Sequence, residues 1–160
     1  MITVERAPEQ KAKAAAQVAT DVNARITLER DRRLASGASF NVIGIADPVP
    51  LTGRPSDQTV YLALLMQAQA LKAALNDTAR ITLRDGANQI HELTPDQVLQ
   101  LIGQGQAWFE AVMVTSWAMK DSTAPFEAGP PADLTDDAHW PPVFPAPTAQ
   151  AAGRFQRAKT

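Results

Sequence analysis

A hairpin signal followed at once by a helix-capping sequence, within residues 83–121, is the feature that most constrains how this chain can fold. Asp85 and Gly86 stand between two alternating apolar runs, and both tolerate the positive φ that a two-residue hairpin turn needs. Such a turn would set Ile81 opposite Ile90, with one face of the hairpin packed against the core and the other exposed to solvent. The sequence therefore predicts an antiparallel strand pair in which Asp85 is a turn residue rather than an acid–base group.

The helix after this hairpin is predicted to begin at Pro95. Thr94 and Gln97 form a capping box, in which each side chain accepts a hydrogen bond from the other residue's backbone N–H. Pro95 suits the first helical position because its missing N–H would have no partner there. Apolar residues then recur at helical spacing and are interpreted as core: Val98, Leu101, Ile102, Trp108, Phe109, Val112 and Met119.

Residues 8–34 are predicted to form a long N-terminal helix. Pro8 suits its first turn, the following segment is rich in Ala, and Gly37 is placed to act as its C-cap. Its apolar stripe is thin, with small or β-branched side chains: Ala15, Val18, Val22 and Ile26. Two alternatives remain open, namely packing on the chain's own domain near residues 26–34 or packing on identical helices as in a coiled coil.

The segment after the N-terminal helix is predicted to hold one short strand. Residues 39–45 alternate apolar side chains between two faces, with Phe40 and Val42 on one of them. Pro48 and Pro50 then predict an extended connector rather than a second strand.

The next helix is expected to be the central helix of the core. Residues 60–75 are apolar nearly all round, which is typical of a helix covered on most sides. Ser56 or Asp57 is the expected N-cap, and Asn76 is expected to close the helix because Asn tolerates the left-handed conformation.

The composition changes after Asp121. Seven of the twelve prolines fall between Pro125 and Pro147, and no periodic apolar pattern is present. The same segment carries four aromatic side chains that a solvated linker would not need: Phe126, Trp140, Phe144 and Phe155. An extended, Pro-rich strip with spaced aromatics is suited to lying on the surface of another subunit.

Composition also disfavours several classes of function. The formal net charge of -2 provides no field that would concentrate nucleic acid or an anionic membrane, and no apolar run approaches the length of a membrane span. There are no cysteines, and the two histidines, His91 and His139, have no metal-ligand spacing. We expect no cofactor, no metal and no catalytic residues. Arg30, Arg32 and Arg33 are interpreted as a solvated helix end rather than a phosphate site.

Several local strings, in this order and spacing, resemble a family of unknown function found in tail gene clusters of tailed bacteriophages and prophages, domain of unknown function forty-three seventy-six. The resemblance covers residues 28–121 and implies a small α+β domain in a tail, baseplate or fibre component, with no assigned catalytic residues. A further string, "DDAHWP", looks like a C-terminal extension of some members. The matching strings are "RDRRLASG", "TGRPSDQ", "LRDGANQIHELT" and "SWAMKD".

The sequence thus predicts an α+β fold, a small domain of three helices with a short strand and a β-hairpin. Residues 1–27 are the expected assembling helix region, residues 28–121 the core domain, and residues 122–160 a Pro-rich docking arm. The expected partner-binding residues are Val18, Val22, Ile26, Trp140, Phe144 and Phe155.

The expected function is that of a structural component of a phage tail, acting by subunit–subunit binding. A tail-fibre assembly chaperone is the main alternative, and a glycan-active tail enzyme a more remote one. We expect other phage tail proteins and copies of this chain as partners, with a trimer if the protein belongs to a fibre, and neither nucleic acid nor membrane. The expected location is the virion, after synthesis in the bacterial cytoplasm.

Overall fold

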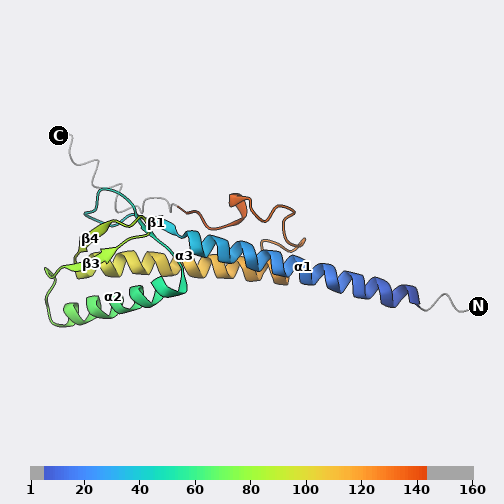
Figure 1. Ribbon diagram of the computed structural model, residues 1–160, viewed down its shortest axis with the longest axis horizontal. Helices are drawn as coiled ribbons and strands as arrows, with labels where there is room; N and C mark the ends of the chain where they lie inside the picture. Colours follow the sequence, from blue (N-terminus) through green and yellow to red (C-terminus); the bar gives the residue numbers. More distant parts are fainter. Residues whose placement is uncertain (1–5, 144–160) are drawn as a thin grey trace, which may run out of the picture.

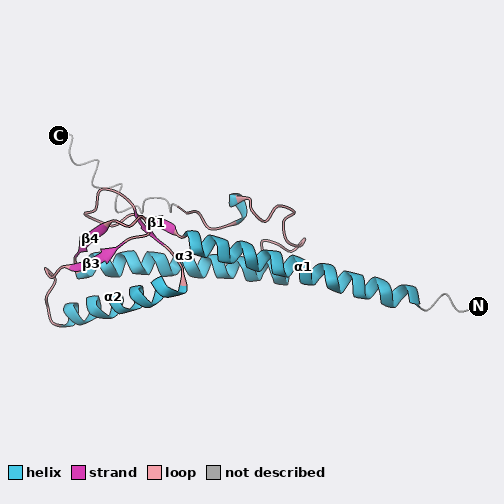
Figure 2. Ribbon diagram, viewed as in Figure 1, coloured by secondary structure: helices cyan, strands magenta, loops and turns pink. Residues whose placement is uncertain are grey.

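The computed structural model describes residues 6–143 and has the predicted α+β fold, built around an antiparallel pair of long helices (Figures 1 and 2). Helices α1 and α3 lie side by side, and α2 lies along the opposite side of the N-terminal half of α3. Two small antiparallel strand pairs, β1 with β2 and β3 with β4, pack at the same end as α2. The elements are α1 (Arg6–Ser36), β1 (Ala38–Phe40), β2 (Val49–Leu51), α2 (Pro55–Ala73), β3 (Ile81–Arg84), β4 (Ile90–Leu93), α3 (Pro95–Asp121) and a short 3-10 helix η1 (Asp137–His139).

Helix α1 ends where the sequence predicts. The backbone N–H of Gly37 donates to the carbonyl of Arg33, and Gly37 has a φ of +76°. A Cβ at this position would lie 1.9 Å from the carbonyl oxygen of Leu51 in β2. Only glycine satisfies both the left-handed backbone and this close approach, so Gly37 fixes where the chain leaves α1 and enters β1.

The first strand pair differs from the prediction of one strand and a proline connector. Strand β1 stops at Phe40, and Pro50, opposite Ser39, lies within β2. Proline lacks the N–H that a central strand would use, but it is tolerated in a two-stranded sheet, where every strand is an edge. Phe40 and Val42 are buried as expected, whereas Ile43 is exposed.

Helix α2 corrects the prediction of a central buried helix. Only Ala68 is fully buried, and the other side chains that face α3 are partly exposed. The N-cap is Arg54, which makes no side-chain cap, because Pro55 takes the first helical position and the Asp57 carboxylate instead accepts a hydrogen bond from the Thr52 hydroxyl.

The C-terminus of α2 also differs from the prediction, by one residue. Leu75, rather than Asn76, adopts the left-handed conformation, with a φ of 56°. The backbone N–H of Asn76 then donates to the carbonyl of Leu71, five residues earlier, which is the Schellman arrangement.

The β3–β4 hairpin is present, but its turn is longer than the predicted two residues. Ile81 pairs with Leu93 and Leu83 with His91, so the predicted pairing of Ile81 with Ile90 is wrong. The loop spans residues 85–89, and Asn88 takes the positive φ, at 67°. This register turns Ile81, Leu83 and Leu93 toward the core.

The start of α3 is as predicted. The Gln97 N–H donates to the Thr94 hydroxyl at 3.3 Å, and the Thr94 N–H donates to the Gln97 side chain at 2.9 Å. Ser122, with a φ of 50°, closes the other end.

Replacing Thr94 with Ala should lower the free energy of unfolding by about 0.5 to 2 kcal/mol, because the N–H of Gln97 loses its side-chain acceptor. The shift of the urea midpoint measures this loss, with Thr59→Ala in the exposed part of α2 as the control. An unchanged midpoint for Thr94→Ala would show that the capping box does not stabilise α3.

The core extends beyond both predicted boundaries of the central domain. Ile26 lies before residue 28 and is fully buried, while Leu134 and Trp140 lie after residue 121 and are buried in the same cluster. Residues 122–143 therefore fold back on their own chain, and residues 28–121 do not contain the whole core.

Candidate interaction surfaces

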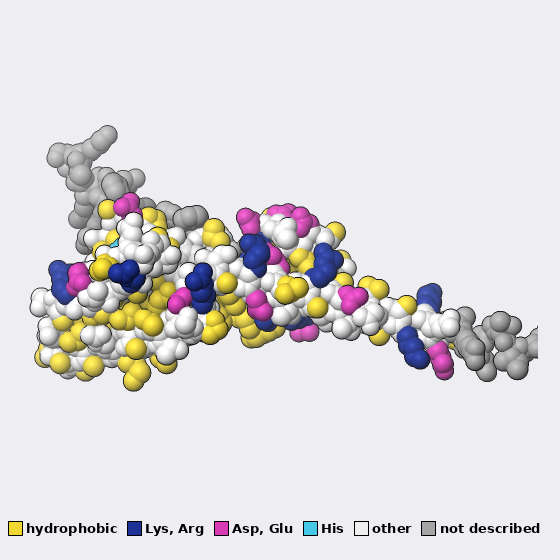
Figure 3. Space-filling view, in the orientation of Figure 1, with side chains coloured by type: hydrophobic (Ala, Val, Ile, Leu, Met, Phe, Trp, Pro, Cys, Tyr) yellow, Lys and Arg dark blue, Asp and Glu magenta, His cyan; other side chains and the backbone are white. Residues whose placement is uncertain are grey.

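Helix α2 presents an uncharged apolar surface to solvent. Between Asp57 and Lys72 it has no charged residue. On its outer side the Leu62 and Met66 side chains are 57% and 62% exposed. Hydrophobic side chains gather along the lower edge of the molecule over α2, where charged side chains are sparse (Figure 3). A single exposed Leu is ordinary, but a helix surface with no charge over this length is typical of an interface.

Helix α3 also exposes apolar side chains. Leu62 of α2 and Phe109 of α3 line the same groove, and further along α3 the Val114 and Trp117 side chains are exposed. Trp117 is 50% exposed, so it does not belong to the core in the way that Trp108 does. We refer to the four side chains Leu62, Met66, Val114 and Trp117 as the uncharged face, and the exposed Glu110 of α3 lies at its edge.

The N-terminal half of α1 projects beyond the end of α3 (Figure 1). All side chains from residue 8 to residue 21 are exposed, including Val18 at 62%, and Val22 is partly buried against the core. Ile26 is fully buried within its own chain, which corrects its prediction as a partner-binding residue. The exposed part of the stripe is therefore Ala15 and Val18, which line one groove with Val22, Met119 and Pro130 where α1 leaves the body.

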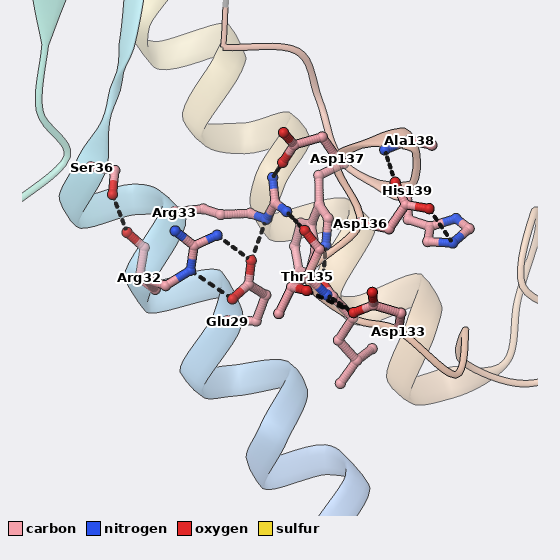
Figure 4. Close-up of polar contacts among 12 residues, drawn as sticks. Glu29, Arg32, Arg33, Ser36, Asp133, Thr135, Asp136, Asp137, Ala138 and His139 are labelled. Atoms are coloured by element: carbon pink, nitrogen blue, oxygen red, sulfur yellow. Dashed lines mark hydrogen bonds and ion pairs between the residues drawn. The ribbon is translucent and has the colours of Figure 1, made fainter.

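The last turns of α1 hold a buried ionic cluster with the C-terminal segment (Figure 4). The Arg33 guanidinium donates to a Glu29 carboxylate oxygen at 2.7 Å, to an Asp137 carboxylate oxygen at 2.8 Å and to the carbonyl of Thr135 at 2.9 Å. Arg33 and Glu29 are both buried, whereas Asp137 is mostly exposed. The prediction of a solvated helix end is therefore wrong for Arg33.

Arg32 completes this cluster from the solvent side. Its guanidinium donates to both carboxylate oxygens of Glu29, at 2.7 and 2.6 Å. The hydrogen bond from Arg32 is the main cause that holds the pKa of Glu29 below its ordinary value, and it outweighs the opposing effect of burial. Glu29 is therefore an ionised carboxylate shared by two arginines.

Trp140 stacks on the same cluster. The Arg33 guanidinium carbon lies 5.0 Å from the Trp140 ring centroid, and the indole Nε1–H donates to the carbonyl of Leu134 at 2.8 Å. Trp140 is buried in the single chain, which corrects the expectation that it is exposed until another subunit covers it. Phe144 and Phe155, the other aromatic residues predicted to bind partners, lie outside the described residues.

Asp85 organises the hairpin loop from a buried position. Its carboxylate accepts hydrogen bonds from the N–H groups of Ala87 and Gln89 at 2.9 and 2.8 Å, and contacts His91 Nε2 at 2.7 Å. Burial tends to raise the pKa of Asp85, but the contacts with His91 and the two backbone N–H groups outweigh it, and the net pKa is lowered. The arrangement is structural and confirms Asp85 as a turn residue.

Because the pKa of Asp85 is lowered on folding, its contribution to stability is fully present above its ordinary value of 3.8 and is lost as the pH falls through the lowered pKa. Asp85→Asn should be less stable than wild type by about 1.5 to 3 kcal/mol near pH 6, with a smaller difference near pH 3. Urea unfolding at both pH values measures this. A difference that does not change with pH would contradict an ionised Asp85.

A groove of about 360 Å³ runs between α2 and α3, next to Phe40 of β1 and Leu51 of β2. Its walls include Phe40, Tyr61, Leu65 and Ile102. Trp108 also lines it, and the Trp108 indole N–H is buried without a hydrogen-bond partner among the described residues. Buried N–H groups are nearly always paired, so this donor is an exception among the described residues.

Within residues 6–143, no group of three or more His, Cys, Asp or Glu side chains is placed to hold a metal ion. None of the helices in this part of the chain is long and apolar enough to cross a membrane.

The fold and these surfaces define a small helical α+β domain with an uncharged helix face and a projecting helix. The family model described as "Domain of unknown function (DUF4376)" matches residues 12–139. The chain belongs to this family, which is the one that its local strings resemble. The match also takes in most of α1 and the segment through η1, more than the predicted coverage of residues 28–121. No curated protein and no solved structure matches the chain.

Proposed function

We propose that this protein is a structural subunit of a bacteriophage tail, in the tail, baseplate or tail-fibre region, and that it acts by binding neighbouring subunits. The uncharged face carries the proposal. Leaving Leu62, Met66 and Trp117 about half exposed or more is unfavourable in water, and contact with another subunit would remove that apolar area at roughly 25 cal/mol per Å² before ordering costs.

The projecting half of α1 supports the same proposal. All side chains of residues 8–21 are exposed, and a helical segment with so little packing is only marginally stable in water, so packing against identical helices would stabilise it. We propose a homo-oligomer, a trimer if the subunit belongs to a fibre, in which Val18 and Val22 lie between helices. The phage context itself comes from the resemblance of the local strings to members from tail gene clusters.

Mass spectrometry of purified particles from the phage or prophage that encodes this chain tests the proposal. We expect the protein in the particles at a copy number comparable with that of other tail components. Its absence from particles, together with its presence in the lysate, would contradict a virion role. That result would favour the alternative, a tail-fibre assembly chaperone, because an exposed apolar groove also suits transient binding of another protein's segment.

A further inference from the structure

The groove between α2 and α3 is an open space lined mainly by apolar side chains. An occupant that fits it must therefore bring an apolar side chain to fill the space.

The charge of the groove narrows the choice of occupant. Glu110 is the one charged residue among those that line it in the described part of the chain. Within residues 6–143, the Glu110 carboxylate accepts a hydrogen bond only from the Gln106 side chain, at 3.1 Å, and it is exposed. A cationic group next to an apolar anchor would therefore complement this rim.

The chain has such a segment where its described residues end. The carbonyl of Val143 accepts a hydrogen bond from the Ser39 N–H at 2.9 Å, and the next residue of β1, Phe40, forms part of the groove wall. Residues 144–160 include three basic and no acidic side chains, and Phe155 lies between Arg154 and Arg157. Phe155 is twelve residues beyond Val143, so an extended chain could span about 40 Å, enough to pass around the edge of a domain this size.

We propose that the groove between α2 and α3 is a binding site for residues 144–160 of this chain. Phe155 fills the apolar space, and Arg154 or Arg157 pairs with Glu110. A second copy's α2 is a poorer occupant, because that helix has no cation between Asp57 and Lys72 to meet Glu110. The proposal does not depend on the phage role, because it concerns how one chain's C-terminal segment is held.

Photo-crosslinking on the full chain tests this directly. A benzoylphenylalanine in place of Phe155 should crosslink to α2 within residues 58–65 or to α3 within residues 102–110, mapped by mass spectrometry. Mixing ¹⁴N- and ¹⁵N-labelled chains tells whether the segment binds its own groove or that of a neighbouring copy, and either result supports the site. Crosslinks that all fall outside the groove would overturn the proposal.

Exchange of the Trp108 indole proton gives an independent readout. The resonance is assigned with Trp108→Phe. Phe155→Ala in the full chain should raise the exchange rate at least about tenfold, because Phe155 covers the groove wall that Trp108 helps to form and its loss makes opening of that wall easier. Thr148→Ala is the matched control and should leave the rate unchanged. Equal rates in wild type and Phe155→Ala would overturn the proposal, as would protection that depends on protein concentration but not on Phe155, which would indicate another surface of a second copy.

Discussion

Replacing Leu62 and Met66 with Glu is expected to convert the assembled protein to monomer. Both side chains lie on the uncharged outer side of α2, where two carboxylates would be buried without partners in any contact with another subunit. Burying an unpaired charge in an interface costs on the order of 2 to 5 kcal/mol, so association should weaken by at least about a hundredfold. Sedimentation velocity of the full chain across a concentration series measures the change.

The control for this double variant is Ile90→Glu, since Ile90 is similarly exposed but lies on the β3–β4 hairpin rather than on the uncharged face. It should leave association unchanged. The double variant should also melt close to the temperature of the wild-type monomer, because both side chains are more than half exposed within residues 6–143. Unchanged association in the double variant would show that this side of α2 does not bind subunits.

Arg33→Ala should lower the free energy of unfolding by about 3 to 5 kcal/mol, the usual cost of removing one partner from a buried ion pair. Three hydrogen bonds from the Arg33 guanidinium would be lost, and Trp140 would lose the cation that it stacks on. The segment from Leu134 to Trp140 should detach first. Urea unfolding measures the stability, and limited proteolysis measures the opening of residues 122–143.

Arg32→Ala is the matched control for Arg33→Ala. Arg32 binds the same Glu29 carboxylate, but its side chain is more than half exposed. The loss should therefore be about 1 kcal/mol or less. Equal effects of the two substitutions would contradict a central role for Arg33 in fastening the C-terminal segment.

The parts of the fold that could be predicted are those fixed by local chemistry. The capping box at Thr94 and the glycine cap at Gly37 depend on residues within one turn of each other, and both are present. The predicted register of the hairpin is wrong because the Asp85 side chain accepts hydrogen bonds from two backbone N–H groups and thereby stabilises a longer loop. Sequence spacing alone does not distinguish that loop from a two-residue turn.

The errors at the interaction surfaces have a different cause. An apolar stretch without charge, such as residues 60–75, is equally consistent with a buried helix and with one that faces another subunit. The sequence predicts a buried helix, whereas Leu62 and Met66 within it are exposed. The burial of Trp140 depends on Arg33, more than a hundred residues earlier, and no periodic pattern reports such a contact. The string "RDRRLASG" contains Arg33, but nothing in it indicates that Arg33 stacks on Trp140.

We propose that the uncharged face is covered by another subunit in the assembled particle. Hydroxyl-radical footprinting tests it directly, because Met66 and Trp117 are readily oxidised and both are exposed in the single chain. We predict that both side chains are oxidised in the isolated protein and protected in purified particles, whereas the buried Trp140 is protected in both. Equal oxidation of Met66 and Trp117 in the isolated chain and in particles would contradict the account.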